Sequence, residues 1–442
     1  MRIVQLVPTL SYGDAVGNDV LALHQILKDY DPETKIYALG IDTERIDASV
    51  YENLSDLPML SDGDIIFYHM AIGSAEMRQV LLEQHCRKYI IYHNVTPPHF
   101  FAGYSETAVL ATRHAFDDLE ALRKNVSGCL AASEFNMNDM VKLGYDVPMA
   151  VLPIVVPFDD YAVEPSEEVI ARYKDDGFTN ILFVGRIAPN KKHEDIIKAF
   201  CYYQKHINPK SRLFLVGNWA GQEIYYDRLS RYIEALGVEN VLFSGHISFR
   251  DILAYYRLAD VFLCMSEHEG FCVPLLEAMY FDVPILAYDS TAIPYTLGKA
   301  GLIFKNKAPE QVAFLIDQLV SRPDLRQDVL ACQQERLRFF SYENVSGIAR
   351  KLIKDIIDHK EFSVVCEQKA AENNGTLQNE VLGQSGNAKR KEKLLSFEKI
   401  PMQIDNRPWY LRLMSKAYKS VYSLDPVLAD KIKTRIKNMS QS

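Results

Sequence analysis

Short apolar runs, separated by amphipathic stretches of helical length, recur from the amino terminus to about residue 305. Runs rich in Val, Ile, Leu, Phe and Tyr without polar alternation are typical of strands buried on both faces. Their alternation with helical stretches predicts βαβ units and parallel sheets. We expect strands at 2–7, 35–39, 64–68, 89–92, 129–132 and 150–154, and then at 180–184, 212–216, 241–244, 261–265, 284–288 and 302–304.

These runs are too many for one open sheet, which rarely exceeds about ten strands. The break should fall near 156–175, where the acidic stretch PFDDYAVEPSEE holds two prolines and lacks a clear period. We therefore expect an α/β protein with two doubly wound, Rossmann-like domains, 1–157 and 158–358, facing across a cleft. In such sheets ligands bind off the carboxyl ends of the strands.

The character of the chain changes after these two domains. Residues 359–405 are mostly polar and predict a flexible linker. Residues 406–442 are basic and aromatic, and Tyr410, Leu413, Met414, Ala417 and Val421 recur there at helical spacing. An amphipathic basic helix of this kind suits an anionic membrane surface. The alternatives are packing against the body of the protein and binding to a partner protein.

Composition excludes several classes of protein. Hydrophobic residues at 48% and charged residues at 24% of the 442 positions match a soluble globular protein. No apolar run approaches the ~18 residues of a membrane span, and the first residues read as a strand rather than a secretory signal. The seven cysteines lack C-x-x-C spacing, which argues against a disulfide framework or zinc site and fits a reducing cytosol.

The net charge of −9 hides an asymmetry along the chain. Residues 406–442 hold eight Lys or Arg and two Asp, so the tail carries +6 and the rest −15. The balance argues against bulk binding of nucleic acid and indicates an anionic partner surface local to the tail.

The most informative motif is SEHEGFCVPLLEAM at 266–279, directly after an expected strand. Pro274 suits the first turn of a helix, which would place Glu269 in the loop and Glu277 in that first turn. A helix amino terminus favours phosphate, and the two carboxylates are suited to polyol hydroxyls. The alternative is a helix cap with one solvated acid. The amides expected to face an anion or a sugar are those of Gly270, Phe271, Cys272 and Val273.

Two further loops follow strands. In FVGRIAPNKKHEDII at 183–197, Gly185 permits a tight turn, and Arg186 and Lys191 precede a helix. Both cations are suited to phosphate oxygens; the alternative is a pair of solvated surface cations. Gly13 and Gly17 lie between the first expected strand and helix, where dinucleotide-type folds approach a diphosphate, or they are ordinary turn glycines.

Two histidines, His69 and His93, occupy expected carboxyl ends of strands in the first domain. Either could hydrogen-bond a sugar or assist proton transfer near neutral pH, although a single histidine is more often structural. His99 and His268 are further candidates near the same loops.

Taken in order, the Gly-rich first loop, the strand-ending histidine, G-R-x4-K and E-G-F-x-x-P-x-x-E-A-M resemble the retaining GT-B glycosyltransferases of family 4, the group 1 transferases. The resemblance covers about 1–355 and is strongest over 180–305, where VGRIAPNKK, FLVGNW, FSGHIS, YRLADVFLCMSEHEGFCVPLLEAM and VPILAYDSTAIP follow the family's order. The ordered set is more specific than any part of it and favours the functional interpretation of the cations and the two glutamates.

The resemblance implies a role for each matching residue. Arg186 and Lys191 would hold the diphosphate of a nucleotide-sugar, and Glu277 the ribose. Glu269 would hold the donor sugar, and His93 would face the reacting sugar, with His69 as an acceptor-side candidate. The remaining donor-binding positions are Gly13, Gly17, Gly185, Gly245, His246, Ile247, Gly270, Phe271, Cys272, Val273, Pro274 and Leu275. One departure is Pro294-Tyr295, where many relatives have Pro-Glu.

The expected reaction is transfer of a sugar to a glycan or lipid-linked acceptor, with retention of configuration, in bacterial surface polysaccharide or glycoconjugate synthesis. Fixed cations and a helix terminus aimed at the leaving diphosphate would lower the barrier. Asp-x-Asp in a metal-site context is missing from these motifs, so we expect no metal requirement. The expected location is the cytoplasm, with peripheral attachment to the inner face of the membrane as an option. The alternatives are a non-catalytic sugar-nucleotide-binding or scaffolding protein, a sugar-nucleotide epimerase and a phosphorylase.

Overall fold

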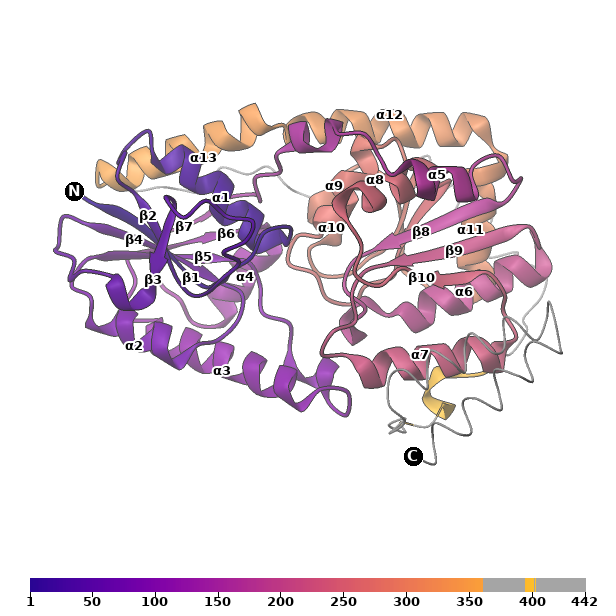
Figure 1. Ribbon diagram of the computed structural model, residues 1–442, viewed down its shortest axis with the longest axis horizontal. Helices are drawn as coiled ribbons and strands as arrows, with labels where there is room; N and C mark the ends of the chain where they lie inside the picture. The colour runs from indigo at the N-terminus through magenta and orange to yellow at the C-terminus, as the bar shows by residue number, and fades with distance from the viewer. Residues whose placement is uncertain (361–393, 401, 403–442) are drawn as a thin grey trace. The chain divides into compact units, whose positions relative to one another are not determined.

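Two all-parallel sheets organise the computed structural model, which describes residues 1–360, 394–400 and 402. The first sheet has the order β3-β2-β1-β4-β5-β6-β7 and the second β10-β9-β8-β11-β12-β13 (Figure 1). The first is formed by β1 Ile3–Leu10, β2 Lys35–Ile41, β3 Tyr51–Asn53, β4 Ile65–Met70, β5 Arg87–Tyr92, β6 Gly128–Ala131 and β7 Met149–Val151. The second is formed by β8 Thr179–Val184, β9 Ser211–Val216, β10 Val241–Phe243, β11 Val261–Cys264, β12 Ile285–Tyr288 and β13 Leu302–Phe304.

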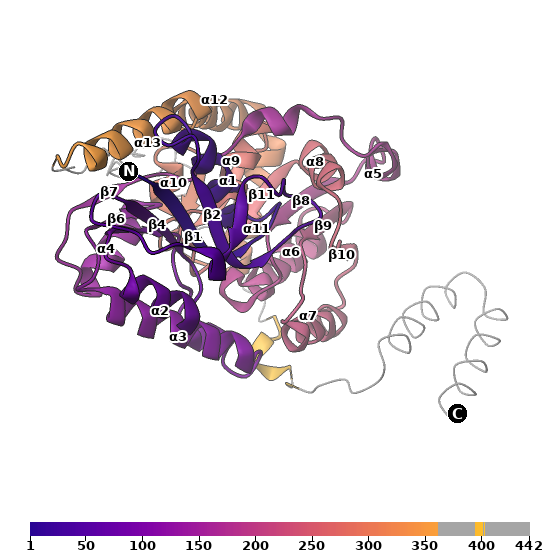
Figure 2. The ribbon, with the colours of Figure 1, turned by 60° about the vertical axis from the view of Figure 1, so that its left-hand side comes forward.

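Helices cover both faces of each sheet (Figures 1 and 2). Several begin where a serine or aspartate supplies the N-cap acceptor, as Ser133 does for α4 and Asp14 for α1. The helices are α1 Ala15–Leu27, α2 Ala75–Glu83, α3 Glu106–Leu122, α4 Glu134–Lys142, α5 Glu167–Tyr173, α6 His193–His206, α7 Glu223–Leu236, α8 Phe249–Leu258, α9 Val273–Tyr280, α10 Ile293–Leu297, α11 Pro309–Ser321, α12 Pro323–Phe339 and α13 Tyr342–Ile357.

The first sheet is buried on both faces, as its continuous apolar runs predict. Ile3 and Phe67 point into the same core as α1, whereas Leu6 and Tyr68 point into the core formed with α2 and α3. Successive side chains of a strand alternate between faces, so a strand covered on both sides needs apolar residues at every position.

All twelve expected strands are present, and the expectation of parallel sheets is confirmed. The chain passes from the first sheet to the second between β7 and β8, a segment that contains residues 156–175. The strand β3, Tyr51–Asn53, was not predicted, because its sequence YEN is short and half polar.

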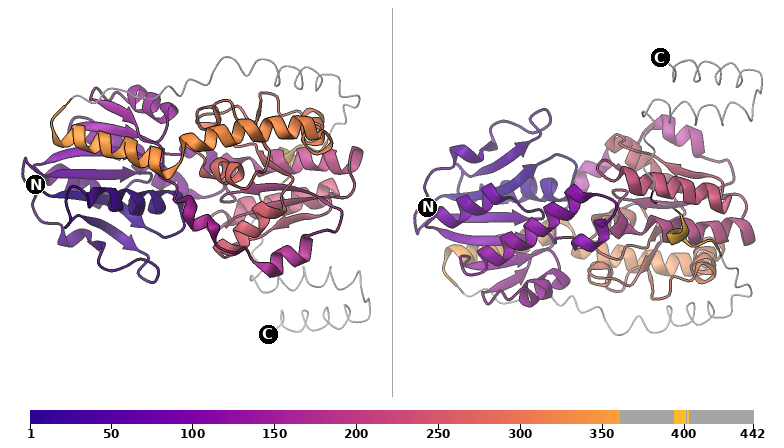
Figure 3. Two further views of the ribbon diagram at one scale, coloured as in Figure 1. Left: turned by 90° about the horizontal axis from the view of Figure 1, so that it is seen from above. Right: turned by 90° about the horizontal axis from the view of Figure 1, so that it is seen from below.

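Helix α13 returns to the first sheet after the second is complete. It packs against α1, and the hydroxyl of Tyr30 donates to the carbonyl of Arg350 at 2.8 Å. Arg87 of β5 donates to the carbonyl of Ile356 at 2.6 Å. Figure 3 shows α13 over one face of the first sheet and α2 and α3 over the other.

Part of the expected flexible linker is a docked segment, residues 394–400. Phe397 and Ile400 are buried, and Arg228 of α7 donates to the carbonyls of both at 2.9 Å. Residues 361–393, 401 and 403–442 lie outside the described residues, and they include most of the expected linker and the whole basic tail. Among the described helices, none is long and apolar enough to cross a membrane.

Candidate active site

The strand order reverses at one point in each sheet, between β1 and β4 in the first and between β8 and β11 in the second. Open parallel sheets bind ligands at such points, off the carboxyl ends of the strands. The loop after β1 holds Gly13, and His69 lies near the end of β4. In the second sheet, Arg186 follows β8 and Glu269 follows β11. The motifs singled out in the sequence therefore occupy both reversal points.

The buried Glu269 and the half-buried Lys191 form an ion pair between the two loops of the second sheet. Lys191 Nζ lies 2.5 Å from Glu269 Oε2, and Glu269 is 6% exposed. Burial alone would lower the pKa of Lys191, but the neighbouring Glu269 carboxylate raises it. Thr291 holds the loop by accepting the Glu269 amide through Oγ1 at 2.9 Å. Lys191 therefore carries a fixed positive charge at the strand ends.

Helix α9 begins at Val273, with Pro274 in its first turn as expected and Leu275 buried beneath it. Cys272 is its N-cap, with φ of 73°. The structure corrects the expected position of Glu277: because it is the fifth residue of the helix, it lies in the second turn rather than the first.

Two tyrosine hydroxyls donate to the Glu277 carboxylate, Tyr161 at 2.8 Å and Tyr256 at 2.5 Å. Burial raises the pKa of Glu277, and these hydrogen bonds oppose that shift. A carboxylate offers about four acceptor positions, so positions remain for ligand hydroxyls. Neither tyrosine was singled out from the sequence, because Tyr161 lies in the segment between the domains and Tyr256 is an ordinary core position of α8.

The amides at the start of α9 form a group of free donors. Within the described residues, no acceptor engages the N–H groups of Gly270, Phe271 or Cys272. Together with the N-terminal end of α9, they provide a favourable environment for negative charge.

Arg186 is exposed, and its charge acts on Asp14, the N-cap of α1. Partial desolvation by the surrounding chain raises the pKa of Asp14, and the nearby Arg186 lowers it in part. The first loop and the loop after β8 are thus neighbours, as a shared diphosphate site requires. Asp14 was not predicted, although its place before A-V-G-N-D marks it as a helix N-cap.

Gly17 lies in the first turn of α1, not in the loop where it was expected. A Cβ there would stand 1.7 Å from the carbonyl oxygen of Ser11, so only glycine fits beside the returning loop. Gly13 lies in the loop itself, and its amide donates to Asn18 Oδ1 at 3.0 Å.

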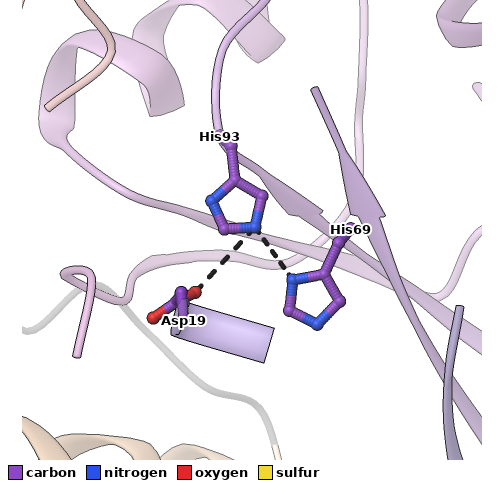
Figure 4. A group of neighbouring side chains, drawn as sticks. All are labelled: Asp19, His69 and His93. Carbon is purple, nitrogen blue, oxygen red and sulfur yellow. Dashed lines mark hydrogen bonds and ion pairs between the residues drawn. The ribbon is translucent and has the colours of Figure 1, made fainter. Parts of the chain in front are cut away.

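The first-sheet histidines meet at the strand ends, as Figure 4 shows. His69 is the penultimate residue of β4 and His93 directly follows β5. His69 Nδ1 lies 2.8 Å from His93 Nε2, and both side chains are buried.

The histidine loop of the first sheet touches the Glu269 loop of the second. Asn94 Oδ1 and His268 Nε2 lie 2.6 Å apart, and Ser133 donates to the carbonyl of Gly270 at 2.8 Å. A Cβ on Gly270 would stand 2.5 Å from the carbonyl oxygen of His93, so glycine permits this contact. His268 is explained by this contact, and Asn94, which sequence reasoning missed, has a φ of 89°.

The remaining expected positions lie in or beside the second sheet. Gly185 directly follows β8, and the loop after β10 contains Gly245, His246 and Ile247. Trp219 lies beside Gly245 and stacks on Tyr226 with ring centroids 4.1 Å apart. Tyr295, at the departure from the family pattern, lies in α10, where its carbonyl accepts from Arg336 at 2.7 Å.

Two sets of metal-ligating side chains converge in the described residues, which the sequence did not indicate: Asp19, His69 and His93, and Cys264, Glu269 and Cys272. The sequence did not indicate the first set because its members lie far apart in the chain and meet only at the strand ends. In the second set Lys191 already pairs with the Glu269 carboxylate, and in the first set the histidines bond each other.

Comparison with known proteins agrees with this geometry. Residues 167–331, which run from α5 into α12, match the family model of glycosyl transferases group 1. The resemblance inferred from the motifs is confirmed for this region. The fold is GT-B, and solved structures of that fold cover both sheets.

Two relatives are similar to about half of the chain. The chain is 24% identical over 220 residues to O-antigen chain mannosyltransferase B of Escherichia coli, covering 49% of this chain and 57% of the relative. It is 30% identical over 246 residues to alpha-monoglucosyldiacylglycerol synthase of Acholeplasma laidlawii, covering 53% and 60%. The matches therefore span less than two thirds of these relatives. HepE from Anabaena, solved with UDP and glucose, aligns with a TM-score of 0.62 at 16% identity, covering 80% of this chain and 100% of HepE.

Proposed function

We propose that this chain is a retaining glycosyltransferase that moves a sugar from a nucleoside-diphosphate sugar to a glycan or lipid-linked acceptor. One observation carries the proposal: Lys191, paired with Glu269, and Arg186 lie at the reversal point of the second sheet, and the Glu269 loop contacts the His93 loop. This arrangement supports the proposal, because a leaving diphosphate is stabilised by nearby cations and His93 lies in the loop that meets them.

The proposed role of each residue follows from the chemistry of its side chain. When the bond between the sugar and the diphosphate breaks, negative charge grows on the leaving oxygen. Lys191, Arg186 and the free amides before α9 would stabilise that charge without rearranging. Glu269 would accept from the sugar hydroxyls and Glu277 from the ribose. The acceptor would attack from the face that the diphosphate leaves, which preserves the anomeric configuration.

The named relatives support both acceptor classes, because one acts on an O-antigen chain and the other bears the name of a glucosyldiacylglycerol synthase. We infer a role in bacterial surface polysaccharide or glycoconjugate synthesis, in the cytoplasm or at the inner face of the membrane.

A thermal-shift panel of nucleoside diphosphates tests the donor assignment, and UDP is the first probe because HepE was solved with it. The matching nucleotide should stabilise the fold by about 2.7 kcal/mol at a hundredfold excess over its Kd. Donor-sugar consumption is then measured with and without glycan and lipid acceptors. Binding without turnover would favour the non-catalytic alternative, and isomerised donor would favour the epimerase.

We also propose that the reaction needs no divalent metal. The cations that face the leaving group are Arg186 and Lys191, and Glu269 already has Lys191 as its partner. Activity should therefore persist in EDTA, measured as sugar transfer after dialysis against chelator. Loss of activity that magnesium or manganese restores would contradict this.

A further inference from the structure

Asp19 of α1 forms a buried cluster with His69 and His93 at the strand ends of the first sheet (Figure 4). The cluster continues to Gln5 of β1. His69 Nε2 lies 2.8 Å from Gln5 Oε1, and His69 Nδ1 lies 2.8 Å from His93 Nε2. The two ring planes differ by 15°. The three side chains thus form a continuous line of hydrogen bonds from the middle of the sheet to its carboxyl edge.

The amide of Gln5 sets the direction of this line. Its Nε2 donates to the carbonyl of Val20 at 3.3 Å, which turns its Oε1 toward His69. An amide oxygen only accepts hydrogen bonds, so His69 must carry its proton on Nε2. A neutral imidazole has one N–H, so His69 Nδ1 is an acceptor and His93 must donate from its own Nε2.

His93 Nδ1 is therefore the bare nitrogen at the end of the line. It is buried, and no partner for it exists among the described residues. Leaving a buried acceptor unpaired costs about 1–3 kcal/mol. This orphaned atom is the observation that points to a ligand, because a ligand hydroxyl would satisfy it.

The contact between the two rings itself requires a neutral acceptor, because an imidazolium has no bare nitrogen. Burial lowers the pKa of His93 to about 4 and that of His69 well below its ordinary value. The nearest carboxylate, Asp19, is 3.9 Å from His93 Nε2, beyond hydrogen-bond distance, and its other oxygen accepts from the Val155 amide at 2.8 Å. Burial raises the pKa of Asp19 to about 7, which weakens its pull toward a charged imidazolium.

We propose that Gln5 and His69 are positioning residues that hold His93 in its Nε2–H tautomer and so present the Nδ1 lone pair to a sugar hydroxyl. The proposal rests on the proposed function for the identity of the hydroxyl, but the tautomer assignment does not. In the opposite tautomer His93 would present an N–H, which can only donate to the oxygen of a hydroxyl and cannot accept its hydrogen. Gln5 would thus select how the sugar is held without touching it.

Nitrogen-15 NMR of the full chain with labelled histidine tests the assignment directly, because protonated and bare ring nitrogens have distinct shifts. His69→Asn and His93→Gln identify the two residues among the eleven histidines. We expect both rings to carry the proton on Nε2. A proton on Nδ1 of His93 in the unsubstituted protein overturns the proposal, whether or not the protein transfers sugar.

Gln5→Leu removes the acceptor at the start of the line. His93 should then show a mixture of tautomers, and turnover should fall roughly 10–100-fold, by analogy with the range for partners that orient metal-ligating histidines. Binding of the bare nucleoside diphosphate should not change. The control is Gln333→Leu, another fully buried glutamine, which bonds the amide of Ile285 and the carbonyl of Val283. It should lower stability without altering the His93 spectrum.

The two hypotheses fail in different ways. If no nucleotide or sugar donor binds, the proposed function fails, but the nitrogen-15 shifts still test the tautomer assigned to His93. If donors bind and react but Gln5→Leu leaves the His93 tautomer unchanged, the positioning role of Gln5 is wrong and the transferase assignment stands.

Discussion

The half-buried Lys191 keeps its charge because the buried carboxylate of Glu269 lies beside it. Removing either member of the Lys191–Glu269 pair leaves an uncompensated charge out of water, which is costly. Arg186 has no such constraint, because it is exposed. The two cations are therefore expected to differ in their effect on stability even if both act on the same diphosphate.

Replacing either cation tests the proposed diphosphate site. Arg186→Ala and Lys191→Ala should each reduce turnover by roughly 10²–10³-fold, the scale for losing one transition-state partner. Only Lys191→Ala should also lower the melting temperature. Lys305→Ala is the matched control, because this lysine side chain is 85% exposed and pairs with Asp289. Near-normal rates in both folded variants would exclude the diphosphate role.

The two glutamates are predicted to act on different parts of the donor. Glu277→Gln should mainly weaken binding of the bare nucleoside diphosphate, because the proposed partner of Glu277 is the ribose. Glu269→Gln should mainly reduce turnover, because its proposed partner is the sugar. Calorimetric titration of the diphosphate into both variants, with steady-state rates alongside, measures the difference. Equal losses of binding would show that the roles are not separate.

At the scale of elements, strands were predictable because a strand covered on both faces leaves a continuous apolar run. The loops were harder, because their contacts join residues far apart in sequence. The motif after β11 showed that Glu269 would lie beyond a strand end, but its pairing with Lys191 depends on β8 and β11 being neighbours. Gln5 reads as a polar interruption in a strand, and only the fold reveals its contact with His69.

The docked segment 394–400 was hidden by its polar surroundings. Its apolar residues Leu394, Leu395, Phe397 and Ile400 follow a charged stretch, so composition averaged over the linker concealed them. The ring of Phe397 lies 4.3 Å from the Arg228 guanidinium and packs against Tyr232. A cation over an aromatic face and two carbonyl acceptors explain why α7 holds this segment.

Phe397→Ala should release this segment while leaving the sheets intact. The buried ring supplies the apolar contacts of the segment, and local elements can open without global unfolding. Amide exchange in 394–400 should accelerate, with little change in the exchange of β8 and β9. Met402→Ala is the control, because Met402 is 48% exposed. Unchanged exchange in Phe397→Ala would show that the Arg228 hydrogen bonds alone hold the segment.

At the scale of the whole molecule, the basic tail stays a prediction from sequence. A net charge of +6 over residues 406–442, with apolar residues at helical spacing, is suited to an anionic bilayer. The full chain should sediment with anionic liposomes at low salt, and a chain ending at Met402, which keeps the docked segment, should not. Salt should weaken the attachment through screening. Equal sedimentation of both chains, or of neither, would contradict membrane binding by the tail.

The return of α13 to the first sheet has a consequence for how the chain is made. The first sheet ends at β7, yet the helix that covers α1 begins at Tyr342. A ribosome adding 5–20 residues per second needs roughly 10–40 s to reach α13 after the last strand of that sheet. During this interval the apolar residues of α1 that face α13 have no cover, so the first domain is completed only after the second has been synthesised. A fragment cut between the two sheets would lack this covering helix permanently, and the order of synthesis therefore links the solubility of the first domain to the presence of the second.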